Sequence, residues 1–153
     1  MVGREDKKEN DLFFLCSLIE YIARKTKNSP GVIAKKLGRK RLEKIYDLAD
    51  VYHSDNIDDV TDEFVEECNI ENGDFDNIST CMYAVPTHWD MGKVYKRLIL
   101  YIAKQENLDV IQALENLFSS PFINRIENYN SDLYYQTHDV QYDFYAEERY
   151  YAQ

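Results

Sequence analysis

A stretch of six residues occurs twice in this chain, and it limits the folds that the chain can adopt. Residues 18–23 read Leu-Ile-Glu-Tyr-Ile-Ala, and residues 98–103 read Leu-Ile-Leu-Tyr-Ile-Ala. Five of the six positions are identical, at an offset of 80 residues. We therefore predict two diverged copies of one unit, residues 10–70 and 91–151, joined by a different connector over residues 71–90.

Both predicted copies have the apolar spacing of α-helices. Leu12, Leu15, Ile19 and Ile22 lie three or four residues apart, which places them on one side of a helix. Proline and glycine, which interrupt helices, number only three and five in the chain. The offset of 80 residues also assigns Phe144 to a core position.

We predict one all-α domain over residues 1–153, a helical bundle in which two four-helix units share a core. The expected helices of the first unit are residues 10–27, 30–37, 39–52 and 57–68. Those of the second unit are residues 91–105, 108–118, 121–135 and 138–151. Residues 1–9 are charged and expected to lie outside the first helix, with Asn10 or Asp11 as its N-cap. In the connector we expect a turn at residues 72–74 and a short strand or extended segment at residues 81–85.

The composition is that of a folded, acidic chain. Apolar residues make up 44 % of the 153 residues, enough to offset the entropy of folding, so global disorder is not expected. The net charge of −10 disfavours nucleic acids and anionic membranes as partners and favours a basic partner. No apolar run approaches the ~20 residues that span a bilayer, so we predict no membrane segment and, because residues 1–10 are polar, no signal peptide.

The charges are divided between two consecutive segments. Between Arg24 and Lys44 there are nine Lys or Arg residues and one acid; between Asp47 and Asp76 there are twelve Asp or Glu residues and no base. The plainest interpretation is two solvated helix faces that partly neutralise each other. The acidic run could instead meet a basic patch on a partner. It lacks the glycine and glutamate positions of a calcium-binding loop, and we predict no metal site and no cofactor.

A second interpretation of the basic segment is contact with DNA. Residues 30–37 and the helix after Gly38 resemble a helix-turn-helix, which would leave basic side chains free to meet phosphates. The candidate nucleic-acid-binding residues are Lys35, Lys36, Arg39, Lys40, Arg41 and Lys44. The corresponding span of the second unit, residues 108–126, carries a single base, Arg125. A helical hairpin inside a bundle is the commoner outcome of such a pattern, so a DNA-binding regulator is the alternative function.

Tyrosine is concentrated at the end of the chain, where residues 128–153 hold seven of the 13 tyrosines. Tyrosine combines a large apolar face with a polar tip, so it is enriched at protein interfaces. The alternative is that these rings only cover the outside of the bundle. Four of these tyrosines, together with two aromatic residues of the connector, are the candidate partner-binding residues: Tyr134, Tyr142, Tyr150, Tyr151, Tyr83 and Trp89.

The sequence offers no convincing catalytic arrangement. Cys16, Cys68 and Cys81 are an odd number of cysteines at irregular spacing, which indicates neither a disulfide framework nor a zinc site. The three histidines are scattered, and no Ser-His-Asp or Cys-His arrangement can be proposed from spacing. We therefore predict that the protein is not an enzyme and that its thiols are free, in the cytoplasm.

The first unit resembles a family of small helical bacterial proteins of unknown function. The similar residues are Phe-Phe-Leu-Cys at 13–16, Ile-Glu-Tyr at 19–21 and Ile-Tyr-Asp at 45–47. Some members of that family are encoded beside ADP-ribosyltransferase-like proteins in what look like toxin–antitoxin pairs. The resemblance covers the first half of the chain and reaches the second half through the repeat. It implies a cytoplasmic protein that binds a partner protein encoded nearby, as an antitoxin, and it carries over no catalytic residue.

Overall fold

The computed structural model describes the backbone of residues 4–152 and the side chains of residues 7–151. Over this part of the chain it contains eight α-helices, one 3-10 helix and no strand. In chain order they are α1 (Arg4–Thr26), α2 (Pro30–Asp47), α3 (Ala49–Ser54), α4 (Ile57–Glu67), α5 (His88–Glu106), α6 (Val110–Ser119), α7 (Phe122–Ile126), the 3-10 helix η1 (Leu133–Tyr135) and α8 (His138–Ala152).

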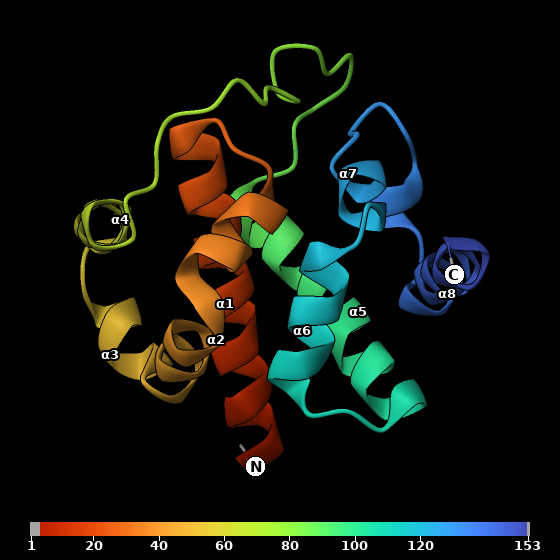
Figure 1. The fold of residues 1–153 in the computed structure, drawn as a ribbon, viewed down its shortest axis with the longest axis horizontal. Helices are drawn as coiled ribbons and strands as arrows, with labels where there is room; N and C mark the ends of the chain where they lie inside the picture. Colours follow the sequence, from red (N-terminus) through yellow and green to blue (C-terminus); the bar gives the residue numbers. More distant parts are fainter. Residues whose placement is uncertain (1–3, 153) are drawn as a thin grey trace.

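Helices α1 and α5 form the central pair of the molecule (Figure 1). Helix α2 packs on α1, α6 packs on α5, and α2 and α6 also pack on each other. Helices α3 and α4 lie against α1 at one side of the molecule, whereas η1 and α8 lie against α5 at the other (Figure 1). The predicted all-α bundle is therefore confirmed, with the two halves of the chain on opposite sides of the α1–α5 pair.

The core follows the predicted apolar stripe of α1. Leu12, Leu15, Ile19 and Ile22 are all 0 % exposed, and the matching residues of α5 are buried with them. The assignment of Phe144 to the core was wrong, because its side chain is 42 % exposed. The buried residues of α8 are instead its neighbour Tyr145 and Gln141, since the helix presents a slightly different face to α5 than the repeat predicts.

The start of α1 differs from the prediction. The helix begins at Arg4, so Asn10 and Asp11 lie inside it and cap nothing. The Asp11 carboxylate is buried and lies 3.2 Å from the Nζ atom of Lys7, one turn earlier. Lys7 also pairs with Asp50 at 3.1 Å. Ion pairs one turn apart stabilise a helix, so residues 4–9 are helical although their composition suggested fraying, and residues 1–3 lie outside the described part of the chain.

Two predicted helices are divided or shortened. Residues 39–52 are split at Leu48, whose φ of −109° and ψ of 26° are not helical, into the end of α2 and the separate helix α3. The helix predicted over residues 121–135 ends at Ile126. Beyond it, the Asn128 carbonyl accepts from the Ser131 N–H (2.9 Å) and the Asn128 side chain from the Asn130 N–H (3.2 Å). Asparagine bonds of this kind favour a turn over a helix.

Helix caps agree with the prediction in part. Thr87 and Asp90 together form a capping box at the start of α5. Helix α4 is capped by Asn56, not by the expected Ser54 or Asp55: the Asn56 side chain accepts from two amides of the first turn. Asn56 directly precedes the first helical residue, Ile57, whereas Ser54 and Asp55 lie further from the helix start.

The connector lies along the bundle and does not fold separately. The Gly73 N–H donates to the Thr26 carbonyl (2.8 Å), and the Phe75 N–H donates to the Lys27 carbonyl (2.9 Å). Residues 72–74 are therefore an extended stretch bound to the end of α1, not the predicted turn. Residues 81–85 form no strand and are not extended throughout, because the backbone bends at residues 82 and 83. The Met82 N–H donates to Asn130 Oδ1 at 2.7 Å.

Several helix ends coincide at the offset of the sequence repeat. Helix α1 ends at Thr26 and α5 at Glu106, and α2 and α6 begin at positions 30 and 110. The residues after α1 and α5, Lys27 and Asn107, both have left-handed backbone conformations, with φ of 56° and 54°. These correspondences agree with the predicted repeat.

Candidate functional site

Three of the six predicted partner-binding residues are freely exposed. Tyr83 in the connector is 64 % exposed, and Tyr150 and Tyr151 at the end of α8 are 72 % and 76 % exposed. The rings of Tyr150 and Tyr151 pack edge to face, with centroids 5.3 Å apart. Large aromatic rings held together in solvent are typical of a protein-binding surface.

The other three predicted residues are partly buried inside the molecule. The Tyr142 hydroxyl donates to Glu106 Oε2 (3.0 Å), and burial and this bond raise its pKa to about 12. The Tyr134 ring packs edge to face on Tyr129, with centroids 5.4 Å apart. Trp89 packs on Phe13, at 5.6 Å. Most of each of these rings already stabilises the fold, and Tyr134 alone among them also lines a cleft.

Trp89 belongs to an aromatic cluster between α1, α3 and α5. Its ring lies 4.6 Å from His88 and 6.0 Å from His53, and His88 packs edge to face on Tyr21 at 4.8 Å. The His88 Nε2 atom is buried and has no hydrogen-bond partner in the described part of the chain. Burial first, and then the nearby Arg24 guanidinium, lower the pKa of His88. At neutral pH His88 is therefore uncharged, and its ring joins α5 to α1 through the contact with Tyr21.

The basic segment is divided between paired and free side chains. Arg39 contacts Glu43 (2.6 Å) on its own helix and Asp109 (3.1 Å) and Glu115 (3.2 Å) of the second half. Arg41 lies 4.0 Å from Glu67. Four lysines are exposed and form no ion pair with any described residue: Lys35, Lys36, Lys40 and Lys44.

Helix α2 does not have the geometry of a helix-turn-helix. Its two segments are separated by the single residue Gly38, whose φ of 76° and ψ of 163° make a kink. A helix-turn-helix needs a turn of about three or four residues between its helices. Because Arg39 follows the kink directly, the kink directs this side chain to α6, where its carboxylate partners hold it.

Part of the acidic run is neutralised within the molecule. Asp58 accepts from both Tyr21 and Lys25, the latter at 2.7 Å, and these two bonds lower the pKa of Asp58. Asp47 pairs with Lys8 at 3.7 Å. In the described residues, no group of three His, Cys, Asp or Glu side chains is placed to hold a metal ion.

A buried polar cluster joins both halves and the connector. Glu20 of α1 and Glu127 after α7 are each 1 % exposed. The Tyr129 hydroxyl lies 3.2 Å from Glu20 Oε2 and 3.1 Å from Glu127 Oε1, and Tyr95 donates to the other oxygen of Glu127. Arg24 donates to Glu20 (2.9 Å) and to the Tyr129 hydroxyl (3.0 Å). The connector adds a bond from the Asn77 amide to Glu127 Oε1 (3.2 Å).

The cluster changes the ionisation of Glu127. Burial, and then the negative charge of Glu20, raise the pKa of Glu127 well above its ordinary value. A protonated Glu127 can donate to Tyr129, which can then donate to Glu20, while Arg24 pairs with Glu20. The Glu20 Oε1 atom is buried without a hydrogen-bond partner among the described residues, and Glu20 and Arg24 line a cavity of about 270 Å³ beneath the connector.

Sequence reasoning missed this cluster, although a signal was present. Glu20 is the single residue that differs between the two six-residue stretches, where the second copy has Leu100. A charged residue in the middle of a fully apolar helix face indicates a buried polar partner. Its partners Tyr95, Glu127 and Tyr129 are distant in sequence, so no spacing pattern connects them.

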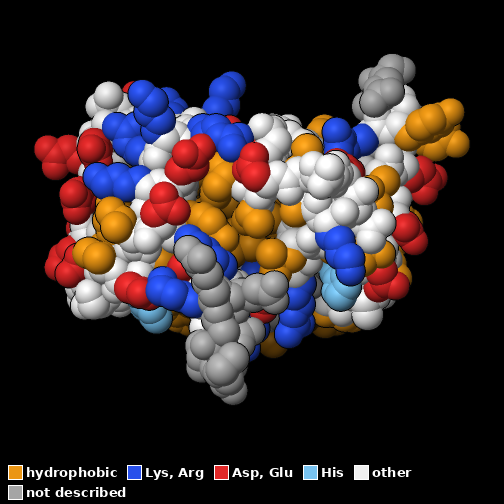
Figure 2. Space-filling view, turned by 90° about the horizontal axis from the view of Figure 1, so that it is seen from below, with side chains coloured by type: hydrophobic (Ala, Val, Ile, Leu, Met, Phe, Trp, Pro, Cys, Tyr) orange, Lys and Arg blue, Asp and Glu red, His pale blue; other side chains and the backbone are white. Residues whose placement is uncertain are grey.

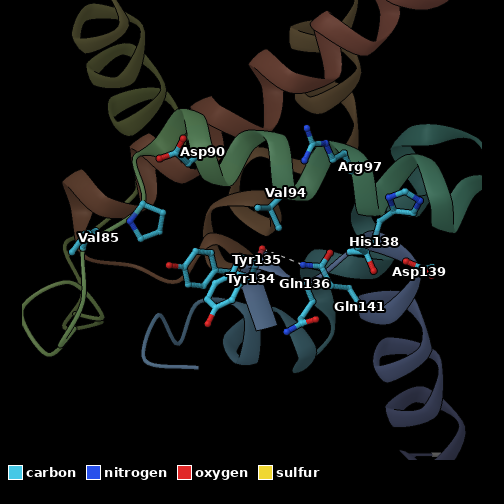
Figure 3. Close-up of a pocket in the computed structure, with 13 residues that line it drawn as sticks. Val85, Asp90, Val94, Arg97, Tyr134, Tyr135, Gln136, His138, Asp139 and Gln141 are labelled. Carbon is cyan, nitrogen blue, oxygen red and sulfur yellow. Dashed lines mark hydrogen bonds between the residues drawn. The ribbon is translucent and has the colours of Figure 1, made fainter. Parts of the chain in front are cut away.

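A cleft of about 820 Å³ lies between α5, the end of the connector and the start of α8. Asp90, Val94 and Arg97 of α5 follow one edge, and Tyr134 lies opposite (Figure 3). Gln141 reaches between these edges and bonds the Tyr134 carbonyl (Figure 3). The sequence predicted Tyr134 for partner binding but gave no indication of the cleft.

The face seen in Figure 2 has hydrophobic side chains at its centre and charges around them. Lys and Arg gather along one upper edge, and Asp and Glu gather at the two ends (Figure 2). Some Asp and Glu side chains also lie among the Lys and Arg of the upper edge, so the two signs of charge are partly mixed on this face (Figure 2).

Comparisons of the chain with protein-family models, with curated proteins and with solved structures give no match. The resemblance to small helical proteins encoded beside toxins therefore stays a prediction. None of the described helices is both long and apolar enough to cross a lipid bilayer.

Proposed function

We propose that this protein is a non-enzymatic interaction module that binds a partner protein, and that it serves as an antitoxin in the cytoplasm. The observation that carries the proposal is the set of exposed aromatic rings on the second half, above all the Tyr150–Tyr151 pair. The apolar faces of these rings are in contact with water, and a partner that buried them would gain hydrophobic binding energy. Free cysteines at positions 16, 68 and 81 support a reducing compartment.

The buried acids do not require an enzymatic role. Buried carboxylates with shifted pKa values are frequent at active sites. In this cluster, however, the donors of Arg24, Tyr95, Tyr129 and Asn77 are directed at Glu20 and Glu127 themselves. A network whose members bond each other, and which joins α1, the connector and the second half, supports a structural role.

The test is to coexpress this chain with the product of the neighbouring gene, to purify the chain by affinity chromatography and to measure the mass of the copurified complex by mass spectrometry. We expect a stoichiometric complex and relief of the growth defect that the neighbour causes alone. Replacing Tyr150 and Tyr151 by alanine should weaken the complex about tenfold or more, because aromatic anchors dominate interfaces. The matched control replaces Leu48 and Val51, which are exposed on the other half, by alanine. A harmless neighbour that does not copurify would contradict the antitoxin proposal.

DNA binding is the second candidate, and the free lysines of α2 favour it. For this candidate we expect salt-dependent binding to promoter DNA that is lost when Lys36 and Lys40 are changed to glutamate. Arg39→Glu is a poor test, because it also breaks the contacts with Asp109 and Glu115. Unchanged binding in the Lys36→Glu/Lys40→Glu protein, or no binding at low salt, would remove this candidate.

We also infer that the two halves descend from one four-helix unit. The inference is supported by the coincident helix ends and by the left-handed Lys27 and Asn107. Pairing of α1 with α5 and of α2 with α6 is the arrangement expected of two copies related by an approximate twofold axis. On this inference the second copy diverged towards partner binding, since the exposed Tyr150 and Tyr151 stand where the first copy has the buried Ile70 and the acidic Glu71.

A further inference from the structure

We propose that the cleft between α5, the end of the connector and the start of α8 receives an arginine side chain from the partner protein. This inference rests on the proposed function and deepens it, because it names the chemistry of the partner and the place where it docks. The volume of about 820 Å³ is within the range of protein pockets that enclose a ligand of small-molecule size. An arginine and part of its main chain fit such a space.

The first observation is an unused hydrogen-bond acceptor. Gln141 is 1 % exposed and donates its amide group to the carbonyls of Leu133 (2.8 Å) and Tyr134 (3.2 Å). Two carbonyl partners fix the nitrogen on that side, so the amide oxygen is on the other side of the group. This oxygen accepts no bond from any residue that the structure describes, and Gln141 lines the cleft (Figure 3). The Gln141 amide oxygen is therefore available to accept a hydrogen bond from a bound group, such as a guanidinium N–H.

The charges around the cleft favour a cation. Asp90 and Asp139 both line it. The pKa of Asp90 is lowered by the Thr87 backbone amide first, and that of Asp139 by the Thr137 hydroxyl first, so both are ionised at neutral pH. Arg97 is the one lysine or arginine that lines the cleft among the described residues. The net charge of −10 would steer a basic segment towards the protein as a whole.

The walls suit the rest of an arginine side chain. Val85, Pro86 and Val94 provide apolar surface against which the aliphatic part can lie. The rings of Tyr134 and Tyr135 also line the cleft, and a guanidinium stacks favourably on tyrosine faces. Tyr135 is 67 % exposed beside the opening. A partner protein would cover this ring, which a free small cation would not.

The first half of the chain shows how such a space is filled internally. Phe14, which is 80 positions before Val94, is 4 % exposed and packs on His53 with ring centroids 5.2 Å apart. Val94 is smaller and only half-buried. The cleft therefore lies where the second half has Val94 in place of the Phe14 ring, which fills the matching space in the first half. A long side chain of a partner can fill the space that Val94 leaves open.

The test is an NMR titration of the labelled full chain with two peptides, acetyl-Gly-Arg-Gly-amide and its citrulline counterpart, which keeps the shape but not the charge. We expect the arginine peptide to shift the backbone signals of Val94 and Arg97 and the side-chain amide of Gln141. The citrulline peptide should bind about fivefold or more weakly. Val94→Phe, which fills the cleft as Phe14 fills its own site, should abolish the shifts, whereas Val51→Phe on the exposed face of α3 should leave them unchanged.

A second variant gives a change in the opposite direction. Arg97→Gln removes the one cation of the cleft and should tighten binding of the arginine peptide roughly two- to fivefold, the range of exposed charge pairs. Equal binding of both peptides, shifts spread over α4 instead of the cleft, or full binding by Val94→Phe would overturn the inference.

The two proposals can fail separately. A stoichiometric complex with the partner that Val94→Phe does not weaken would overturn the cleft inference and leave the interaction module standing. Binding of the arginine peptide at the cleft, without any complex in the coexpression experiment, would support the cleft chemistry and contradict the antitoxin role.

Discussion

The carboxyl group of Glu127 shows how much one buried residue depends on its surroundings. Tyr95, Tyr129 and Asn77 bond it, and Glu20 lies on the other side of the Tyr129 hydroxyl. Because its pKa is raised in the folded protein and ordinary in the unfolded one, folding favours the protonated form. This contribution to stability is complete below the unfolded pKa of about 4.3, and it is lost as the pH rises through the folded pKa.

We predict that Glu127→Gln makes the stability of the protein less sensitive to rising pH. Glutamine keeps the acceptor and donor groups but cannot ionise. The free energy of unfolding of the Glu127→Gln protein should therefore exceed that of the parent protein by a margin that grows as the pH rises. The gain should approach about 1.4 kcal/mol for each pKa unit by which folding shifts Glu127. Urea unfolding across a pH series, followed by Trp89 fluorescence, measures it. Glu63→Gln, on the exposed face of α4, serves as control; a difference independent of pH would contradict the assignment.

At the scale of single helices, two glycines decide geometry. Gly38 has φ of 76° and ψ of 163°, in a region that residues with a side chain almost never adopt. We predict that Gly38→Ala lowers the free energy of unfolding by about 1–3 kcal/mol, the cost of such strain, even though a methyl group there would meet no atom within 4 Å. Lys36→Ala, on the same helix, should be nearly neutral in the same denaturation measurement. Equal stability of both variants would show that α2 relaxes at the kink without cost.

Gly92 permits the close approach of α1 and α5. A Cβ atom at this position would lie 1.9 Å from Ser17 Oγ and 3.0 Å from Ser17 Cβ. We predict that Gly92→Ala destabilises the protein by about 1–3 kcal/mol through overpacking. Adding Ser17→Ala should recover part of the loss, because it removes the nearest atom; thermal unfolding of the single and double variants measures the coupling. Additive effects would mean that the helices move apart instead.

The prediction for the whole molecule concerns its shared core. The apolar stripe of α1 packs against α5, and Tyr129 of the second half bonds Glu20 of the first. A fragment of residues 1–71 would expose that stripe and separate Glu20 from Tyr129. We expect this fragment to lack cooperative urea unfolding as a monomer, or to dimerise with a second α1 in place of α5. A stable, cooperatively folding monomer would contradict a core shared by the two halves.

Much of the fold could be predicted from local patterns, and the candidate sites could be predicted only in part. The repeat and the stripe from Leu12 to Ile22 located the helices that form the centre, because helix periodicity is a local property of the chain. Helix ends at Ile126 and Asp47 were missed, since turn bonds and packing compete there with helix propensity. Tyr150 and Tyr151 were identified for partner binding and are exposed, whereas Tyr142 and Trp89 found partners within the molecule.

The sequence by itself determined that this chain is acidic, helical and organised around two similar apolar stretches, because composition and spacing need no knowledge of distant contacts. Only the tertiary structure decided which charges remain free, since Arg39 meets carboxylates about 70 positions away in the chain. It likewise brought Glu20 beside Glu127 and opened the cleft at Val94. Hydrogen bonds, ion pairs and cavities are made by residues that are neighbours in space, and a single sequence records their types without their positions.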